Sequence, residues 1–290
     1  MSESRRSVAS VHVAREQHEG GGFIVRRPFP SGGLPNLDPI LLLDELGPID
    51  YAPGKAIGAP DHPHRGMETV TYLLEGEGAH ADSAGNAGTL SAGDVQWMTA
   101  GAGVVHREMP SLRMQREGGR SHGFQIWVNL PRVHKMTPPK YQEISAASVP
   151  TVEVEGARGR ILAGDVLGTS AVIETFVPIL IHHWSLEPKA TLELPTPVKH
   201  TVAVYVFDGD VVIDGQSVRR GELAVTTLGD ALTLSSETGA ELMLLGGQPL
   251  EEPIAWQGPF VMNTREELMQ AFADFQAGRM GTIAAEIVRA

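Results

Sequence analysis

The sequence contains no cysteine in its 290 residues. This absence excludes disulfide bonds, thiolate metal sites and cysteine nucleophiles, and it leaves His, Asp and Glu as the strong metal ligands. No run approaches the roughly 18 uninterrupted apolar residues of a membrane helix, and no apolar segment follows the basic pair in the opening MSESRRSVAS. We therefore expect a cytoplasmic protein that does not bind the membrane.

Positive charge is also scarce. The chain has 23 Lys and Arg against 35 Asp and Glu, which gives a formal net charge of -12. Because nucleic-acid binding depends on clustered Lys and Arg, we do not expect a nucleic acid as a direct ligand. The length suits two domains or one large one, and we expect a monomer.

Strand signals dominate the sequence. Short apolar runs rich in Val, Thr, Ile and Leu, such as GFQIWVNLP, alternate with turns that use the 33 Gly and 20 Pro. Such runs at fairly regular spacing predict an all-β sandwich or barrel. Helical periodicity is sustained mainly near the end, where NTREELMQAFADFQAGRMG offers Asn263 or Thr264 as the N-cap and Gly278 as the terminator.

An internal repeat indicates two copies of one β-domain. Tyr72 and Tyr205, 133 positions apart, lie in segments with the same order of features: a strand, a turn with glycine between acidic residues, and further short strands. Repetition of this kind favours two similar units. We predict one domain at residues 1–135 and a second at residues 136–290, with the C-terminal helix in the second.

A His-x-His pair is the first candidate metal site. In DHPHRGMETVTY, His62 and His64 would point to one face of a strand, about 6.6 Å apart. Eleven histidines would give roughly 0.4 such pairs by chance, so the spacing needs support from other residues. Glu68, four positions after His64, has the same parity and is a third candidate ligand.

A second candidate half-site follows a glycine-rich turn. In GDVQWMTAGAGVVHREMP, this turn leads to His106 and Glu108, again two residues apart. Each of two strands can therefore supply ligands at alternate positions, whose side chains point to one face of the strand. Three imidazoles and one carboxylate suit Fe(II), Mn(II), Ni(II), Co(II) or Zn(II), and a six-coordinate ion would keep two open positions. A Walker phosphate loop is excluded, because no Lys-Ser/Thr follows the glycines.

These motifs resemble the paired motifs of the cupin β-barrel superfamily, and the chain is similar in particular to the pirin family of bicupins. The resemblance implies two stacked cupin (jelly-roll-like) β-barrels with a C-terminal helix. It also implies one divalent ion in the N-terminal barrel, with Fe(II) expected and Mn, Ni, Co or Zn as alternatives. The matching segments are LDPILLLDELGP, HPHRGMETVTYLLEGE, DVQWMTAGAGVVHREMP and EPIAWQGPFVMNTREELMQAFADFQAGR.

Carried over residue by residue, the resemblance implies a ligand set of His62, His64, His106 and Glu108. Most cupins take their carboxylate ligand from the first motif, where this chain has Glu68, whereas the pirin pattern uses the glutamate after the last histidine. We therefore expect Glu108 as the ligand and keep Glu68 as an alternative ligand or as a residue that supports the site. Either glutamate is a candidate base.

The second copy of the repeat has no such ligands. At the 133-residue offset, the two histidines of the His-x-His pair fall opposite Pro195 and Pro197. The counterpart of the second motif contains no histidine. We therefore predict that the second barrel is free of metal.

Other polar and aromatic residues are expected to have structural roles. Gln125, Trp97 and Trp127 are candidates for the lining of the first barrel, although a core position is favoured for each tryptophan. Histidines without a partner at ligand spacing are expected on the surface or in hydrogen bonds. These histidines are His12, His18, His80, His122 and His134. In the second copy, the adjacent His182 and His183 would point to opposite faces of a strand and cannot act as a His-x-His pair, and His200 is expected to be structural.

Two classes of function are compatible with this site. The resemblance implies a quercetin 2,3-dioxygenase-type oxygenase that acts on a flavonol-like substrate with O2, in which Glu108 or Glu68 accepts a substrate proton. The alternative is a non-enzymatic, metal-dependent regulatory protein that acts through protein-protein contacts, as the resemblance to animal pirins implies. An isomerase or hydrolase with Zn or Mn is a third interpretation of the same site.

Overall fold

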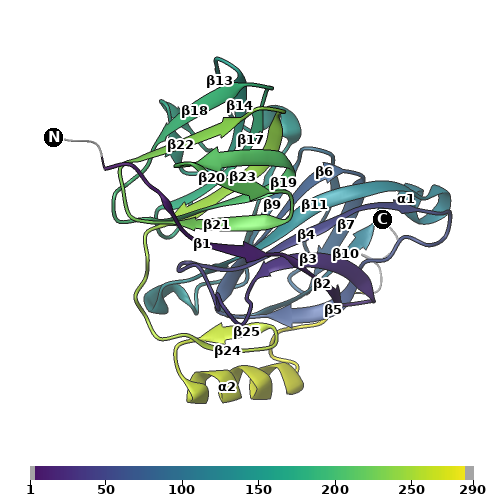
Figure 1. Ribbon diagram of the computed structural model, residues 1–290. Coiled ribbons are helices and arrows are strands. Elements are labelled where there is room, and N and C mark those ends of the chain that lie inside the picture. Colours follow the sequence, from purple (N-terminus) through teal and green to yellow (C-terminus); the bar gives the residue numbers. More distant parts are fainter. Residues whose placement is uncertain (1–3, 285–290) are drawn as a thin grey trace. The chain divides into compact units, whose positions relative to one another are not determined.

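The computed structural model describes residues 4–284, which form mostly antiparallel strands (Figure 1). The prediction of an all-β fold with a C-terminal helix is thereby confirmed. The described chain divides into two compact units, which we call unit A and unit B. Unit A comprises residues 16–26, 43–147 and 251–284, and unit B comprises residues 4–15, 27–42 and 148–250.

These units differ from the expected domains 1–135 and 136–290. The described N- and C-terminal segments change units, residues 27–42 belong to unit B, and residues 136–147 belong to unit A. The N-terminal segment belongs to unit B, since strand β1 (Val8–Val13) pairs with β21 (Glu222–Thr226). The C-terminal segment, expected with the second barrel, belongs to unit A. There, helix α2 (Arg265–Gln276) packs in a cluster with Val105. Both exchanges depend on long-range contacts, which no local sequence pattern reports.

Unit A contains two antiparallel sheets. The smaller sheet has the order β5 (Ala59–His64), β10 (Val104–Pro110), β7 (Glu77–Asp82) and β8 (Ala87–Ser91). Strands β2 (Arg15–Glu19), β3 (Phe23–Phe29) and β4 (Ile40–Tyr51) of the larger sheet are divided between the two units. The larger sheet has the order β12 (Lys140–Ile144), β9 (Val95–Thr99), β6 (Met67–Glu75), β11 (Gly119–Asn129), β4 (Ile40–Tyr51), β3 (Phe23–Phe29) and β2 (Arg15–Glu19).

Unit B is built on one large antiparallel sheet. Its main path runs through β1, β21, β19 (Thr201–Ile213), β23 (Ala240–Gly247), β17 (Ile179–Leu186), β14 (Ala157–Ala163) and β13 (Thr151–Val154). Three further strands extend it: β18 (Ala190–Pro195), β20 (Gln216–Arg219) and β22 (Ala231–Ser236). The short pair β15 (Asp165–Val166) and β16 (Thr169–Ser170) completes the strands of unit B. The 3-10 turn Ala146–Ser148 lies where the chain passes from unit A to unit B.

The interior of unit B is apolar. Alternate residues of β18 are buried, so that Leu192 and Leu194 face the core and Pro195 is exposed. The sequence comparison at an offset of 133 aligned a histidine of the His-x-His pair with Pro195. Because Pro195 is exposed, this comparison selected a position that does not face the core. A shift of one residue reverses the direction of every side chain in a strand.

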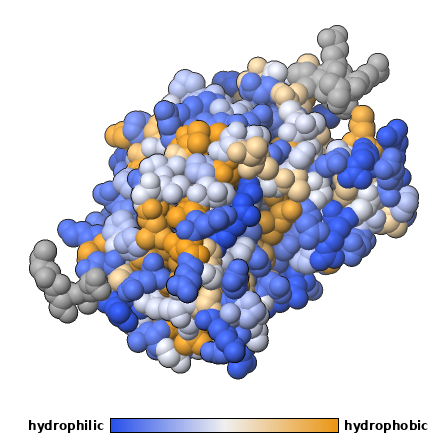
Figure 2. Space-filling model, turned by 90° about the horizontal axis from the view of Figure 1, so that it is seen from above, coloured by the Kyte–Doolittle hydropathy of each residue, from blue (hydrophilic) through white to orange (hydrophobic). Residues whose placement is uncertain are grey.

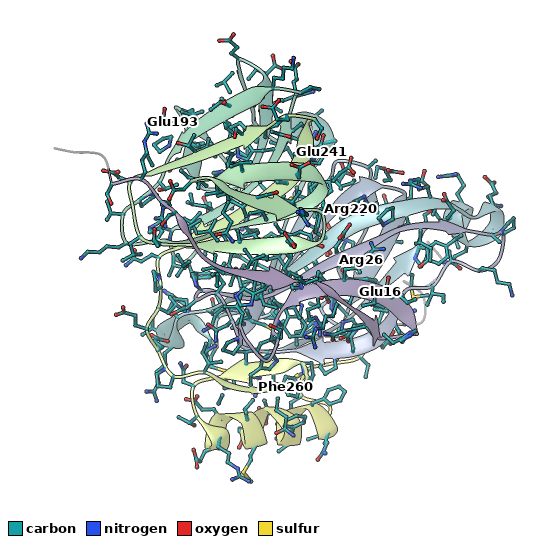
Figure 3. All side chains as sticks on the ribbon, viewed as in Figure 1. Glu16, Arg26, Glu193, Arg220, Glu241 and Phe260 are labelled. Atoms are coloured by element: carbon teal, nitrogen blue, oxygen red, sulfur yellow. The ribbon has the colours of Figure 1, made fainter. Side chains whose placement is uncertain are left out.

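Helix α2 starts as the sequence indicates. Thr264 is the N-cap, and Glu267 completes a capping box with it. The helix packs on the hairpin of β24 (Ala255–Gln257) and β25 (Phe260–Met262), below which it lies in Figure 1. Phe260, labelled in Figure 3, lies in this hairpin, with its ring 4.9 Å from that of Phe272. The remaining helical elements of unit A are α1 (Leu112–Glu117) and the 3-10 turn Arg132–His134.

The surface follows from this distribution of side chains. The face seen in Figure 2 is largely hydrophilic, with apolar residues in small groups between polar ones. Across residues 4–284, neither helix has the length and apolar character needed to span a membrane.

Candidate metal centre

Two neighbouring strands of unit A bring three histidines together. Strands β5 and β10 are antiparallel, with His106 directly opposite His62 and Val104 opposite His64. Because side chains alternate along a strand, all three imidazoles point to one face of the small sheet. Their ring centroids lie 4.3 to 5.0 Å apart. The three side chains can each offer a ring nitrogen to one metal ion, with all three nitrogens within 4.8 Å of one another.

The outer ring nitrogens of two histidines are held by backbone carbonyls. Nδ1 of His62 lies 2.7 Å from the carbonyl oxygen of Pro60, and Nδ1 of His64 lies 3.3 Å from that of Pro259. An Nδ1–H that donates to a carbonyl leaves the Nε2 lone pair free for a metal ion. Neither carbonyl contact is visible in the sequence motif.

The spacing of the inner nitrogens suits a common ion. Nε2 of His62 and Nε2 of His106 are 2.9 Å apart. Two nitrogens that bind one ion at about 2.1 Å and at right angles lie about 3 Å apart. Nδ1 of His106 is buried without a hydrogen-bond partner. The residues therefore fit a nitrogen-bound divalent ion.

The electrostatic environment keeps two of the imidazoles neutral. Burial lowers the pKa of His64 well below its usual value, and the neighbouring rings of His106 and His62 lower it further. Burial also lowers the pKa of His106 well below its usual value, together with the proximity of His62 and His80. Neutral imidazole is the form that binds metal, so both rings are prepared for an ion at neutral pH.

Glu108 extends from the same strand toward the larger sheet. Its Oε1 accepts a hydrogen bond from Thr71 at 2.8 Å, and its Oε2 accepts one from Gln125 at 2.9 Å. Thr71 and Gln125 are cross-strand neighbours on β6 and β11. The carboxylate is thus held near the histidines but is not part of their cluster. Its expected role as a ligand requires the exchange of one of these hydrogen bonds for the ion.

Glu68 lies on the other face of strand β6. Thr71 points toward Glu108, and Glu68 is three residues away in an unbroken strand, so it points the opposite way. Its Oε1 accepts a hydrogen bond of 2.6 Å from Thr99, and burial raises its pKa. The parity counted from His64 does not continue to Glu68, because the chain turns between β5 and β6 at Gly66, with φ of 80°.

Aromatic residues near the histidines divide between the two faces of the larger sheet. Trp127 is on the face of Thr71, and its ring centroid lies 5.0 Å from that of His64. Trp256 of the C-terminal segment lies 5.7 Å from Trp127. Trp97 shares the face of Glu68 and is fully buried. The lining expected of Gln125 and Trp127 thus agrees with their positions, whereas Trp97 is turned away.

A fourth histidine lies next to the site. His80 of β7 is paired with Glu108 across the small sheet, and it is 4% exposed. Its Nε2 lies 2.6 Å from Oε1 of Glu143 on β12, and its ring stacks on Tyr141 at 5.2 Å. The sequence assigned His80 a structural role because its neighbours come from distant strands. No spacing signal in the sequence could have found this group.

Comparison with known proteins places this geometry in a family. A model of the Pirin family matches residues 22–128, and a model of the Pirin C-terminal cupin domain matches residues 181–281. Mouse pirin is 41% identical over 288 residues, which are 97% of this chain and 96% of the mouse protein. The chain belongs to the pirin family. A pirin-like protein of tomato, Solanum lycopersicum, is 40% identical and covers 95% of this chain, and 93% of its own length is matched.

The same architecture is found in a solved structure. The crystal structure of quercetin 2,3-dioxygenase from Acinetobacter baumannii is 38% identical, with a TM-score of 0.92 over 97% of this chain and 100% of that one. The expected family and the expected cupin fold are both confirmed. As a member of the pirin family, this chain carries a cluster of three histidines in unit A that is compatible with a divalent metal.

Proposed function

We propose that unit A holds one divalent metal ion, expected to be Fe(II), and acts as a quercetin 2,3-dioxygenase-type oxygenase. The cluster of His62, His64 and His106 is the observation that carries this proposal. The relative from Acinetobacter baumannii that bears this activity in its name supports the choice of reaction. Mn, Ni, Co or Zn are the alternative ions, since a set of imidazoles and a carboxylate accepts all of them.

The protein residues have separate tasks in this reaction. A bound ion would act as a Lewis acid toward the substrate oxygen and permit chemistry with O2. The three histidines would hold it from one side, because all of them project from the small sheet. Glu108, held by Thr71 and Gln125, would accept the proton of the substrate hydroxyl. We assign the base to Glu108 and not to Glu68, because Glu68 faces the other side of β6.

Flavonol-dependent oxygen uptake tests the proposal. Metal is measured in the protein from its native host, and O2 consumption is then followed with quercetin for the wild type, His62→Ala and His18→Ala. His18 is an exposed histidine of unit A and serves as the control. We expect turnover in the wild type and the control, and its loss in His62→Ala.

The alternative function predicts a different result. Stoichiometric metal without quercetin-dependent O2 consumption would contradict the oxygenase and favour a metal-dependent regulatory protein that acts on a protein partner. The kinship with mouse pirin keeps this alternative in view. The cytoplasmic location and the monomeric state expected from the sequence remain predictions.

A further inference from the structure

The C-terminal segment, residues 251–284, pairs with the end of strand β5. The N–H of Val261 donates to the carbonyl of Arg65 at 3.0 Å. The carbonyl of Pro259 faces Nδ1 of His64, a residue 195 positions earlier in the chain. A carbonyl at this nitrogen sets the tautomer and the orientation of the ring. The segment therefore supplies the contact that holds one of the candidate ligands.

Arg65 connects this segment to both histidine-bearing strands. It follows His64 directly, and its Nε donates to the carbonyl of Ala102 at 2.7 Å, in the turn that leads to His106. Nη1 of the same guanidinium donates to Oδ2 of Asp274 on α2, also at 2.7 Å. The side chains of this ion pair are only 6% and 13% exposed. A rigid guanidinium can hold both acceptors at once, which an ammonium cannot do with the same geometry.

Lys135 makes a second buried link. Its Nζ donates to the carbonyls of Gly66 and Val261, at 2.8 and 2.9 Å, and to Oδ1 of Asn129 at 2.7 Å. These three acceptors use all three protons of the ammonium group. The turn after β5 and strand β25 are thus held together from the inside.

Met280 anchors the far end of the segment beside the second strand. Its carbonyl accepts a hydrogen bond from Ser83 at 2.7 Å, and the same hydroxyl accepts one from the N–H of Val105. Val105 precedes His106. The C-terminal segment therefore contacts the residues next to a histidine on both β5 and β10.

We infer that Arg65 and Asp274 are positioning residues of the metal centre. Their ion pair holds the C-terminal segment in place, so that the Pro259 carbonyl orients His64. The same guanidinium fixes the turn before His106. The inference rests on the proposed metal centre but not on its catalytic activity. Loss of the ion pair is expected to weaken metal binding by about 10- to 100-fold, the range for groups that support metal-bound histidines. Because coupling between two sites is reciprocal, metal binding is also expected to stabilise α2.

Titration with Co²⁺ tests the first expectation. Asp274→Asn removes the negative charge with little change of shape. Arg65→Lys keeps the positive charge but loses the planar guanidinium that donates to both acceptors. Glu75→Gln is the matched control, since Glu75 forms a 2.7 Å pair with Arg120 on the surface of the same unit. We expect weaker binding and an altered Co²⁺ absorption spectrum in Asp274→Asn, a smaller effect in Arg65→Lys, and wild-type behaviour in the control. Unchanged affinity and spectrum in a folded Asp274→Asn protein would overturn the inference.

Hydrogen exchange of the wild type provides a test without any variant. Addition of Co²⁺ is expected to slow amide exchange in residues 259–276 more than in strand β8, which lies in the same unit. Bound Co²⁺ with no such effect would overturn the coupling, whereas a wild type that binds no Co²⁺ would refute the metal centre itself. The two failures are therefore distinguishable.

Discussion

Individual residues of the site are distinguished by the face on which they lie. His62, His64 and His106 share one face of the small sheet, and carbonyl oxygens fix the rings of the first two. The two candidate glutamates differ in the same way. Glu108 points toward the histidine side, while Glu68 points to the other face of β6. Direction, more than distance along the chain, decides which side chain can act.

The two glutamates can be compared by isosteric substitution. Glu108→Gln is expected to weaken Co²⁺ binding by at least about 10-fold, because it removes a negative charge that acts on His64. Glu68→Gln is expected to leave the affinity nearly unchanged. Calorimetric titration of both variants measures the difference. A larger loss in Glu68→Gln would show that the first-motif glutamate is the ligand after all.

Turns determine how the elements present these residues. Gly66 has φ of 80° and connects β5 to β6, and a Cβ at this position would clash with the carbonyl oxygen of Val261. The tight turn therefore allows the C-terminal segment to approach the end of β5. It also interrupts the alternation of side chains between His64 and Glu68.

Substitution of this glycine is expected to affect both stability and metal binding. Gly66→Ala adds the strain of a left-handed residue, about 1–2 kcal/mol, and the clash with the Val261 carbonyl. Gly54→Ala is the control, because Gly54 also has positive φ (74°) but no atom would lie within 4 Å of its Cβ. Urea denaturation and Co²⁺ titration of both variants separate the two effects. Equal results for the two variants would argue against a role for the Val261 contact.

For the molecule as a whole, the two units have different interiors. The space around the small sheet of unit A contains histidines and hydrogen-bonded carboxylates, whereas unit B has an apolar core. His182 is a titratable group beside this core. It lies between Leu180 and Trp184 on the core-facing side of β17, and burial lowers its pKa to about 4.

This histidine makes stability dependent on pH. The unfolded chain binds a proton at the usual pKa of 6.5 while the folded chain does not, so stability is lost as pH falls from 6.5 to about 4. The shift corresponds to roughly 3 kcal/mol. Denaturation of the metal-free protein at several pH values is expected to show this loss, and His182→Leu is expected to reduce it. An identical pH dependence in the variant would contradict this assignment.

A bound ion is expected to stabilise the folded protein. At a free metal concentration of 100 times the dissociation constant, the gain is about 2.7 kcal/mol. The midpoint temperature of thermal unfolding should therefore rise when Co²⁺ is added and return to its original value when a chelator removes the ion. His62→Ala is expected to lose the response, and His18→Ala to keep it. A shift of equal size in His62→Ala would place the ion elsewhere.

Local patterns in the sequence predicted the elements and part of the site. Alternating apolar runs predicted the strands, the cap at Thr264 predicted the start of α2, and two His-containing motifs predicted the cluster. These features depend on neighbours a few residues apart, so the physical rules that relate spacing to direction apply to them. The family resemblance added the cupin fold, which the comparisons confirm.

Only the tertiary structure decided which segments complete each unit and which glutamate faces the histidines. The Pro259 carbonyl reaches His64 across 195 positions, and β1 near the N-terminus pairs with β21, which comes much later in the sequence. The alternation of side-chain directions starts anew after the turn at Gly66. Counting residues from His64 across this turn therefore predicted the wrong face of the strand for Glu68. Contacts between distant segments carry no periodic signal along the chain, and for that physical reason they became visible only in three dimensions.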